Sequence, residues 1–139
     1  MDKKFIRILD TNINRCKEGL RVVEDSMRFV FCDKDLYKEI RNIRHSASSY
    51  LADCYEQMLS ARDSVTDSGK TAPEASRTDL KNIIIANFKR AEESLRVLEE
   101  YSKIIDFETA LKYKALRYEV YDIEKKFFLK HKDSFSVSD

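Results

Sequence analysis

The stretch Asn87–Glu100 reads N-F-K-R-A-E-E-S-L-R-V-L-E-E, and the chain contains a close copy of it 75 residues earlier. There Asn12–Asp25 reads N-I-N-R-C-K-E-G-L-R-V-V-E-D, and seven of the fourteen paired positions are identical. A duplicated apolar spine needs only Leu and Val. The duplicated polar residues therefore indicate a second role besides packing, and they are Asn12/Asn87, Arg15/Arg90, Glu18/Glu93, Arg21/Arg96 and Glu24/Glu99.

Apolar residues around both copies recur in steps of four and three, which is the pattern of a helix with one buried face. This spacing predicts a helix over about 3–31 and another from 78 or 79 to about 104. The first seam is Leu9, Ile13, Cys16, Leu20, Val23, Met27 and Val30, and the second is Ile84, Phe88, Ala91, Leu95, Leu98, Ser102 and Ile105. Gly19 and its counterpart Ser94 are small, which favours close packing of two helices there over close approach of a ligand.

Two further helices are predicted over about 36–61 and 107–130, the second with Asp106 as its N-cap. Their expected apolar residues are Ile40, Ile43, Ala47, Tyr50, Leu51, Cys54 and Met58, and Leu111, Ala115, Tyr118, Tyr121, Ile123, Phe127 and Phe128. The sequence thus predicts an all-α, antiparallel four-helix bundle built from two duplicated helical hairpins. In this single domain, 1–139, hairpin repeats over about 3–61 and 79–130 flank a loop at 62–78, and a polar, frayed tail covers 131–139.

Composition limits the partners of the chain. Only 2 Gly and 1 Pro in 139 residues agree with a helical fold, because turns of sheet proteins draw on both residue types. A net charge of +1 gives no bulk attraction to nucleic acid or to an acidic membrane, so neither is expected as a partner. Three cysteines without paired spacing and no visible signal sequence predict reduced thiols and a cytoplasmic protein.

The polar residues of the repeat have two interpretations. Arg and Glu three or four residues apart on a helix form surface ion pairs worth a few tenths of a kcal/mol each, about 0.3–0.5. Alternatively, Asn and Arg beside an apolar seam are aimed at a planar or anionic ligand. The duplication favours the second interpretation, since surface pairs have no need to keep the same residues at the same register.

The long loop 62–78 holds residues suited to phosphate and metal binding, although a solvated connector would also explain it. Its Ser68-Gly69-Lys70-Thr71 resembles the end of a P-loop, but position 64 is Ser where that motif needs Gly, and no strand precedes it. Asp63 and Asp67 are the candidate metal ligands. Tyr113, Tyr118 and Tyr121 favour core or rim packing over stacking on a ligand ring.

Five blocks of sequence resemble one known family. They are R-x-x-E-G-L-R-V-V-E-D-x-x-R-F (15–29), R-N-I-R-H (41–45), A-R-D-S-V-T-D-S-G (61–69), A-N-F-K-R-A-E-E-S-L-R-V-L-E-E-Y (86–101) and L-R-Y-x-x-Y-x-x-E-K (116–125). Together they resemble the monofunctional hydroxymethylpyrimidine-phosphate kinases of thiamin biosynthesis, a helical domain often fused in front of thiamine-phosphate synthase. The resemblance implies transfer of the ATP γ-phosphoryl group to the pyrimidine monophosphate, with ATP and Mg²⁺ required.

The chemistry of that reaction assigns roles to the candidate residues. Neutralising two phosphate groups needs cations, and a metal needs carboxylates. The expected catalytic residues are Arg15, Arg21, Arg90 and Arg96, with Asp63 and Asp67 for Mg²⁺. The expected substrate-binding residues are Asn12, Asn87, Arg44, His45, Arg62, Glu18 and Glu93.

Two other functions stay open at this point. One is a helical mutase or lyase that holds a small anionic substrate through the same arginines. The other is a non-catalytic helical docking module associated with thiamine-phosphate synthase. The repeat also leaves the oligomeric state open, because a two-fold repeat can pair within one chain or across a homodimer.

Overall fold

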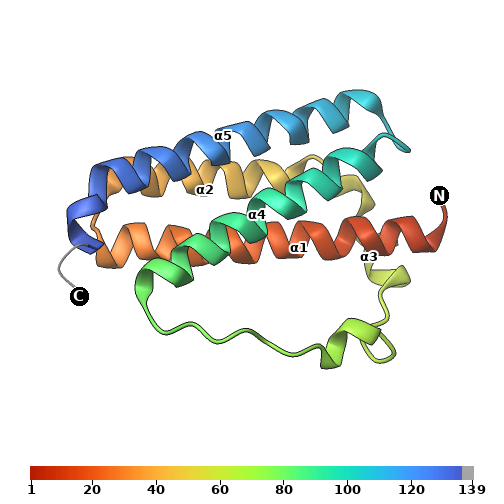
Figure 1. Ribbon diagram of the computed structural model, residues 1–139. Coiled ribbons are helices and arrows are strands. Elements are labelled where there is room, and N and C mark those ends of the chain that lie inside the picture. Colours follow the sequence, from red (N-terminus) through yellow and green to blue (C-terminus); the bar gives the residue numbers. More distant parts are fainter. Residues whose placement is uncertain (136–139) are drawn as a thin grey trace.

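Four long helices form an antiparallel bundle in the computed structural model, which describes residues 1–135 (Figure 1). They are α1 (Lys3–Asp25), α2 (Lys34–Ser49), α4 (Leu80–Ser102) and α5 (Phe107–His131). Helix α1 packs against α2 and α4, and α5 packs against the same two helices. The described residues contain no strand, so the predicted all-α bundle of two hairpins is confirmed.

Short elements join the long ones. The π-helical turn η1 (Ser26–Val30) extends α1, and the short helix α3 (Tyr55–Ala61) follows α2. Three short 3-10 helices complete the described residues, and they are η2 (Ala52–Cys54), η3 (Ser68–Thr71) and η4 (Lys132–Phe135). No helix within residues 1–135 combines the length and the apolar character that crossing a membrane requires.

An aspartate caps the N-terminus of every long helix. Asp2, Asp33, Asp79 and Asp106 each accept a hydrogen bond from a backbone N–H of the first turn, at 2.8 to 3.2 Å. Such a cap satisfies a donor that has no partner inside the helix. The predicted cap at Asp106 is therefore confirmed, and α4 begins one residue after the predicted cap region.

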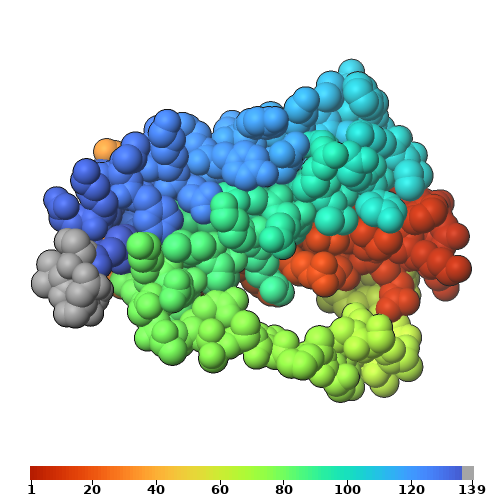
Figure 2. Space-filling model, in the orientation of Figure 1, coloured from red at the N-terminus to blue at the C-terminus, as the bar shows by residue number. Residues whose placement is uncertain are grey.

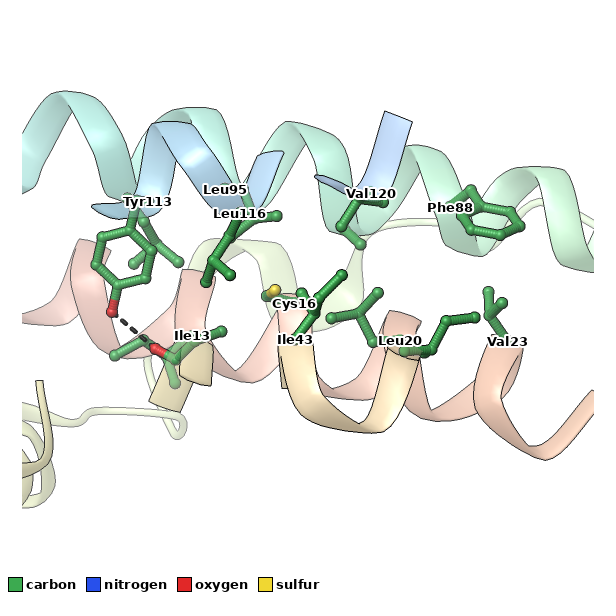
Figure 3. Packing of buried hydrophobic residues seen from close by; sticks show 14 of the residues in the cluster. Ile13, Cys16, Leu20, Val23, Ile43, Phe88, Leu95, Tyr113, Leu116 and Val120 are labelled. Carbon is green, nitrogen blue, oxygen red and sulfur yellow. Dashed lines mark hydrogen bonds between the residues drawn. The ribbon is translucent and has the colours of Figure 1, made fainter. Parts of the chain in front are cut away.

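The predicted seams of α1 and α4 form the centre of the core (Figure 3). Leu20, Val23, Phe88 and Leu95 have no exposed surface. The predicted ends of these seams are wrong, because Val30 and Ile105 are 56% and 37% exposed. Both residues lie beyond the regular part of their helix, where the 3.6-residue period no longer directs side chains inward.

The prediction of one continuous helix over 36–61 is wrong, because the chain leaves helical geometry after α2. At this point the Tyr113 hydroxyl of α5 donates a hydrogen bond to the Ala47 carbonyl at 2.8 Å (dashed in Figure 3). Tyr50 packs edge-on against the same ring, with centroids 5.4 Å apart. A tyrosine of the other hairpin thus donates to a carbonyl in the last turn of α2. Burial raises the pKa of the Tyr113 phenol above its ordinary value.

The predicted apolar face of α5 is partly wrong. Leu111, Ala115, Tyr118 and Tyr121 are exposed. Ile123 and Phe127 are buried as predicted. The rest of the face that packs into the core is Thr109, Ala110, Tyr113, Leu116 and Val120. Helix α5 carries apolar residues on two opposite sides, so its periodicity alone does not identify the buried one.

The predicted frayed tail is also partly wrong. Phe135 lies 5.7 Å from both Phe31 and Phe128, measured between ring centroids. Lys130 and His131 bind the buried carboxylate of Asp33 at 2.8 and 2.7 Å. Burial opposes the charge of Asp33, but these bonds outweigh it and lower its pKa to about 2. The end of α5 is therefore anchored, and positions 136–139 of the predicted tail lie outside the described residues.

Candidate anion-binding site

A cavity of about 710 Å³ lies between α1, α4 and the start of the 62–79 connection. Figure 2 shows the opening that this connection (lime to green) leaves below the bundle. Five of its lining side chains are basic and four are acidic. The lining residues are Lys4, Arg7, Ile8, Asp10, Thr11, Asn12, Asn14, Arg15, Glu18, Arg62, Asp63, Ser64, Asp67 and Arg90.

Gly19 lets α1 and α4 approach closely beside this cavity. A Cβ atom on Gly19 would lie 2.9 Å from the Asn87 carbonyl oxygen and 3.5 Å from the Cβ of Arg90. The counterpart Ser94 is buried at the same crossing, and its hydroxyl donates to the Ala91 carbonyl at 2.9 Å. The expectation of helix packing at these two small residues is confirmed.

The crossing brings Arg15 of α1 and Arg90 of α4, equivalent residues of the repeat, to one cavity. Within residues 1–135 neither guanidinium has a hydrogen bond or an ion pair with another side chain. Their duplicated neighbours differ. Arg21 binds Glu24 at 3.3 Å and Asp25 at 3.7 Å. Arg96 binds Glu99 and, at 3.1 Å, Glu100.

Each buried glutamate of the repeat also receives an arginine from the second helix of its own hairpin. Glu24 accepts from Arg44 at 3.0 and 3.2 Å, and Glu99 accepts from Arg117 at 2.9 Å. Both arginine side chains are 12% exposed. These matched clusters give the duplicated Arg21/Arg96 and Glu24/Glu99 a role in joining helices, away from the cavity.

The remaining predicted binding residues divide between the cavity and the rest of the surface. Asn12 and Asn87 each donate a 2.8 Å hydrogen bond to the carbonyl four residues earlier, which is Ile8 or Ile83. Asn12 and Glu18 line the cavity, whereas Asn87, His45 and Glu93 do not. Of the duplicated pairs Asn12/Asn87 and Glu18/Glu93, only the first-repeat residues thus lie at the cavity.

Arg62 fixes the connection to α1. Its guanidinium donates to both carboxylate oxygens of Asp10, at 2.7 and 2.8 Å, and these bonds raise the pKa of Arg62. Asp10 is 7% exposed and also accepts from Asn14 at 3.3 Å. This bidentate pair holds the start of the connection against the cavity wall. The sequence analysis missed Asp10. The available signal was its position one helical turn before Asn14, on the same side of α1.

Asp63 and Asp67 follow Arg62 along the cavity rim. Asp63 accepts hydrogen bonds from the Thr66 hydroxyl and, at 3.0 Å, from the Thr66 N–H, and these lower its pKa. Asp67 accepts from the Gly69 N–H at 2.9 Å. No cluster of three or more His, Cys, Asp or Glu suited to a metal occurs among residues 1–135. Two carboxylates on the rim of a cavity lined by arginines nevertheless fit Mg²⁺, which takes one or two protein carboxylates and completes its shell with phosphate and water.

The fold is thus a duplicated helical bundle with two arginines, free of acidic partners, at one cavity. The profile of the ThiD2 family matches residues 7–126, and the chain belongs to this family.

Several curated relatives share the name thiamine-phosphate synthase. Those of Synechocystis sp. and Thermosynechococcus vestitus are 42% and 40% identical to this chain, over 85% and 88% of its length. The relative from Rhodopirellula baltica is 38% identical over 86% of the chain. The matched region is 33–35% of these relatives, so the chain spans about a third of their length. No solved structure matches the chain significantly.

Proposed function

We propose that this chain transfers the γ-phosphoryl group of ATP to hydroxymethylpyrimidine phosphate and so forms the diphosphate in thiamin biosynthesis. The observation that carries the proposal is which of the duplicated arginines have an acidic partner. Of the four, the two that lack an acidic partner are the two that line the cavity. Unpaired guanidinium groups from two helices suit a ligand with more than one phosphate group.

The family and the name of its relatives support the pathway. Thiamine-phosphate synthase is an enzyme of thiamin biosynthesis, and the relatives share this chain over most of its length. The cavity volume, about 710 Å³, lies within the range of about 300–1,000 Å³ usual for small-molecule sites.

The reaction needs no catalytic base. The nucleophile is an oxygen of a phosphate monoester, whose second pKa is about 6, so it is already an anion at neutral pH. That oxygen attacks the γ-phosphorus of ATP, the bond to the β–γ bridging oxygen breaks, and ADP leaves. The protein must hold the two anions in line and neutralise their repulsion. In the proposal Arg15 and Arg90 supply this neutralisation from opposite helices.

The other cavity residues have supporting roles. Asn12 keeps its amide N–H on the Ile8 carbonyl, which leaves its Oδ1 to accept from the exocyclic amine of an aminopyrimidine. Asp63 and Asp67 would hold Mg²⁺, and the ion would neutralise charge on the ATP phosphates. Arg62 positions both aspartates through its bonds to Asp10.

The test is an assay of the purified chain with Mg²⁺, ATP and the pyrimidine monophosphate, in which the diphosphate and ADP are quantified. Arg15→Ala and Arg90→Ala should each lower kcat/KM by about a hundredfold or more, since each removes a charge that acts on the transferred group. Arg21→Ala and Arg96→Ala are the matched controls, because their side chains are half-exposed and bound to glutamates. Wild-type protein that makes no diphosphate would refute the proposal.

A second candidate is a docking module for thiamine-phosphate synthase. The observation that favours it is coverage, because about two thirds of each relative lies outside the match. Titration calorimetry with a separate thiamine-phosphate synthase distinguishes the two functions. Tight binding by a chain that turns over no ATP would favour docking.

A further inference from the structure

Helix α5 exposes an apolar stripe along most of its length. Phe107 and Leu129 are each 61% exposed, Tyr118 is 56% exposed and Leu111 is 49% exposed. At about 100° per residue, all of these lie within about 20° of Tyr118 around the helix axis. The buried residues Leu116, Val120 and Phe127 lie on the opposite side. A helix that is apolar on both sides normally has both sides covered.

The centre of the stripe is already ordered. The rings of Tyr118 and Tyr121 meet edge to face with centroids 5.8 Å apart. The guanidinium of Arg117 lies 5.1 and 5.7 Å from the two ring centroids, and Glu99 holds it at 2.9 Å. Tyrosine and arginine are the residue types most enriched at binding hot spots. Because these groups are preorganised, a partner would lose little side-chain entropy by binding them.

The stripe is complementary to itself when reversed about Tyr118. Phe107 and Leu129 lie eleven residues on either side of Tyr118, and Ala115 and Tyr121 lie three residues on either side. Lys114 and Asp122 lie four residues on either side and carry opposite charges. An antiparallel copy of α5 would therefore match Phe107 with Leu129, Ala115 with Tyr121 and Lys114 with Asp122, and it would place Leu111 opposite Lys125.

We propose that the outward face of α5 pairs two copies of this chain, with their α5 helices antiparallel and Tyr118 on the two-fold axis. The symmetric charge pattern favours a second copy over an unrelated partner, which has no reason to match a centre at Tyr118. In such a dimer Tyr118 meets Tyr118, and Phe107 of each chain meets Leu129 of the other. Lys125 meets Leu111 and packs it with its aliphatic stem, as long basic side chains do.

The dimer contact lies apart from the proposed active site. The cavity is lined by α1, the connection and Arg90 of α4, and no residue of α5 contributes to it. A variant of the stripe should therefore become monomeric and keep the activity of the chain. This separates the outcome of the dimer test from the outcome of the kinase test.

Sedimentation velocity over a dilution series of the full chain tests the proposal. The wild type should shift from dimer to monomer on dilution, and Tyr118→Asp should raise the dissociation constant by about tenfold or more, as expected for a central anchor. Phe29→Asp is the matched control, since Phe29 is 66% exposed but lies on η1. A wild type that is monomeric at every concentration would overturn the proposal, and so would equal effects of the two variants.

The register has its own test. Lys114→Glu and Asp122→Lys should each weaken the dimer, and the double variant should restore it, because every pair across the axis again has opposite charges. In a Cys32→Ser background, which removes an exposed thiol, Tyr118→Cys should form a disulfide-linked dimer on oxidation. Leu129→Cys should not, although it is as exposed, because its copies lie at opposite ends of the contact. Equal cross-linking of both, or no rescue by the double variant, would show that the antiparallel arrangement is wrong.

Discussion

The buried glutamates of the two repeats should be of equal importance for stability. In Glu99→Ala, the Arg117 guanidinium loses its 2.9 Å partner in a site where both side chains are at most 12% exposed. In Glu24→Ala, Arg44 loses both of its bonds, at 3.0 and 3.2 Å. Removing one partner of a buried ion pair costs about 3–5 kcal/mol. Because each glutamate also binds a half-exposed arginine that can return to solvent, we expect about 2–3 kcal/mol for each variant.

Urea unfolding followed by circular dichroism measures this loss through the shift of the midpoint at constant slope. The control is Glu93→Ala, an exposed residue of the same repeat, which should change the free energy of unfolding by less than about 0.5 kcal/mol. The double variant Glu99→Ala/Arg117→Ala should be more stable than the sum of its single changes predicts, because no unpaired charge stays buried. Losses below about 1 kcal/mol for both glutamates would refute the reasoning. A loss confined to one of them would refute the equivalence of the two hairpins.

Two further variants test the packing and the electrostatics of the bundle. Gly19→Ala should lower the urea midpoint, because its Cβ would lie 2.9 Å from the Asn87 carbonyl oxygen. Overpacking of this kind costs about 1–3 kcal/mol, which exceeds the gain in helix propensity of about 1 kcal/mol. A raised midpoint would contradict the close contact. Burial and the hydrogen bond to Glu124 raise the pKa of Glu92 from 4.5 to about 7, because they outweigh the lowering effect of the positively charged Lys89. The folded protein therefore keeps a proton that the unfolded chain releases, so stability should fall as the pH rises from about 4.5 to about 7. Glu92→Gln should flatten this part of a stability–pH profile, whereas Glu93→Gln should leave it unchanged.

The sequence predicted the elements that have one apolar side. In α1 and α4 the spacing of Leu20, Val23, Phe88 and Leu95 gives one consistent face, and the structure buries it. In α5 both sides are apolar, and the prediction combined residues of the exposed side, such as Leu111 and Tyr118, with the buried Ile123 and Phe127. The break after α2 escaped prediction because it contains neither Gly nor Pro. Its position coincides with a hydrogen bond from Tyr113, a residue far along the chain.

The candidate site was predictable to a similar extent. The duplication identified Arg15 and Arg90, because identical polar residues at one register stand out without knowledge of the fold. It also identified Arg21 and Arg96, which the structure places in ion pairs. Pairs such as Glu24 with Arg44 join different helices, and periodicity along one helix carries no information about such contacts. Only the packing of the hairpins separates the two kinds of duplicated arginine.

The connection between the hairpins has a consequence for how the protein assembles. Residues 62–79 are exposed along their whole length. They link two hairpins whose pairing would otherwise be a bimolecular association. A tether of this kind sets an effective concentration on the order of millimolar, so the bundle forms at any dilution. Since any chain of sufficient reach would serve as a tether, the bundle places little demand on the sequence between Arg62, which binds Asp10, and Asp79, which caps α4. The bundle therefore does not require the carboxylates of Asp63 and Asp67, and their place at the cavity rim fits the proposed role in holding Mg²⁺.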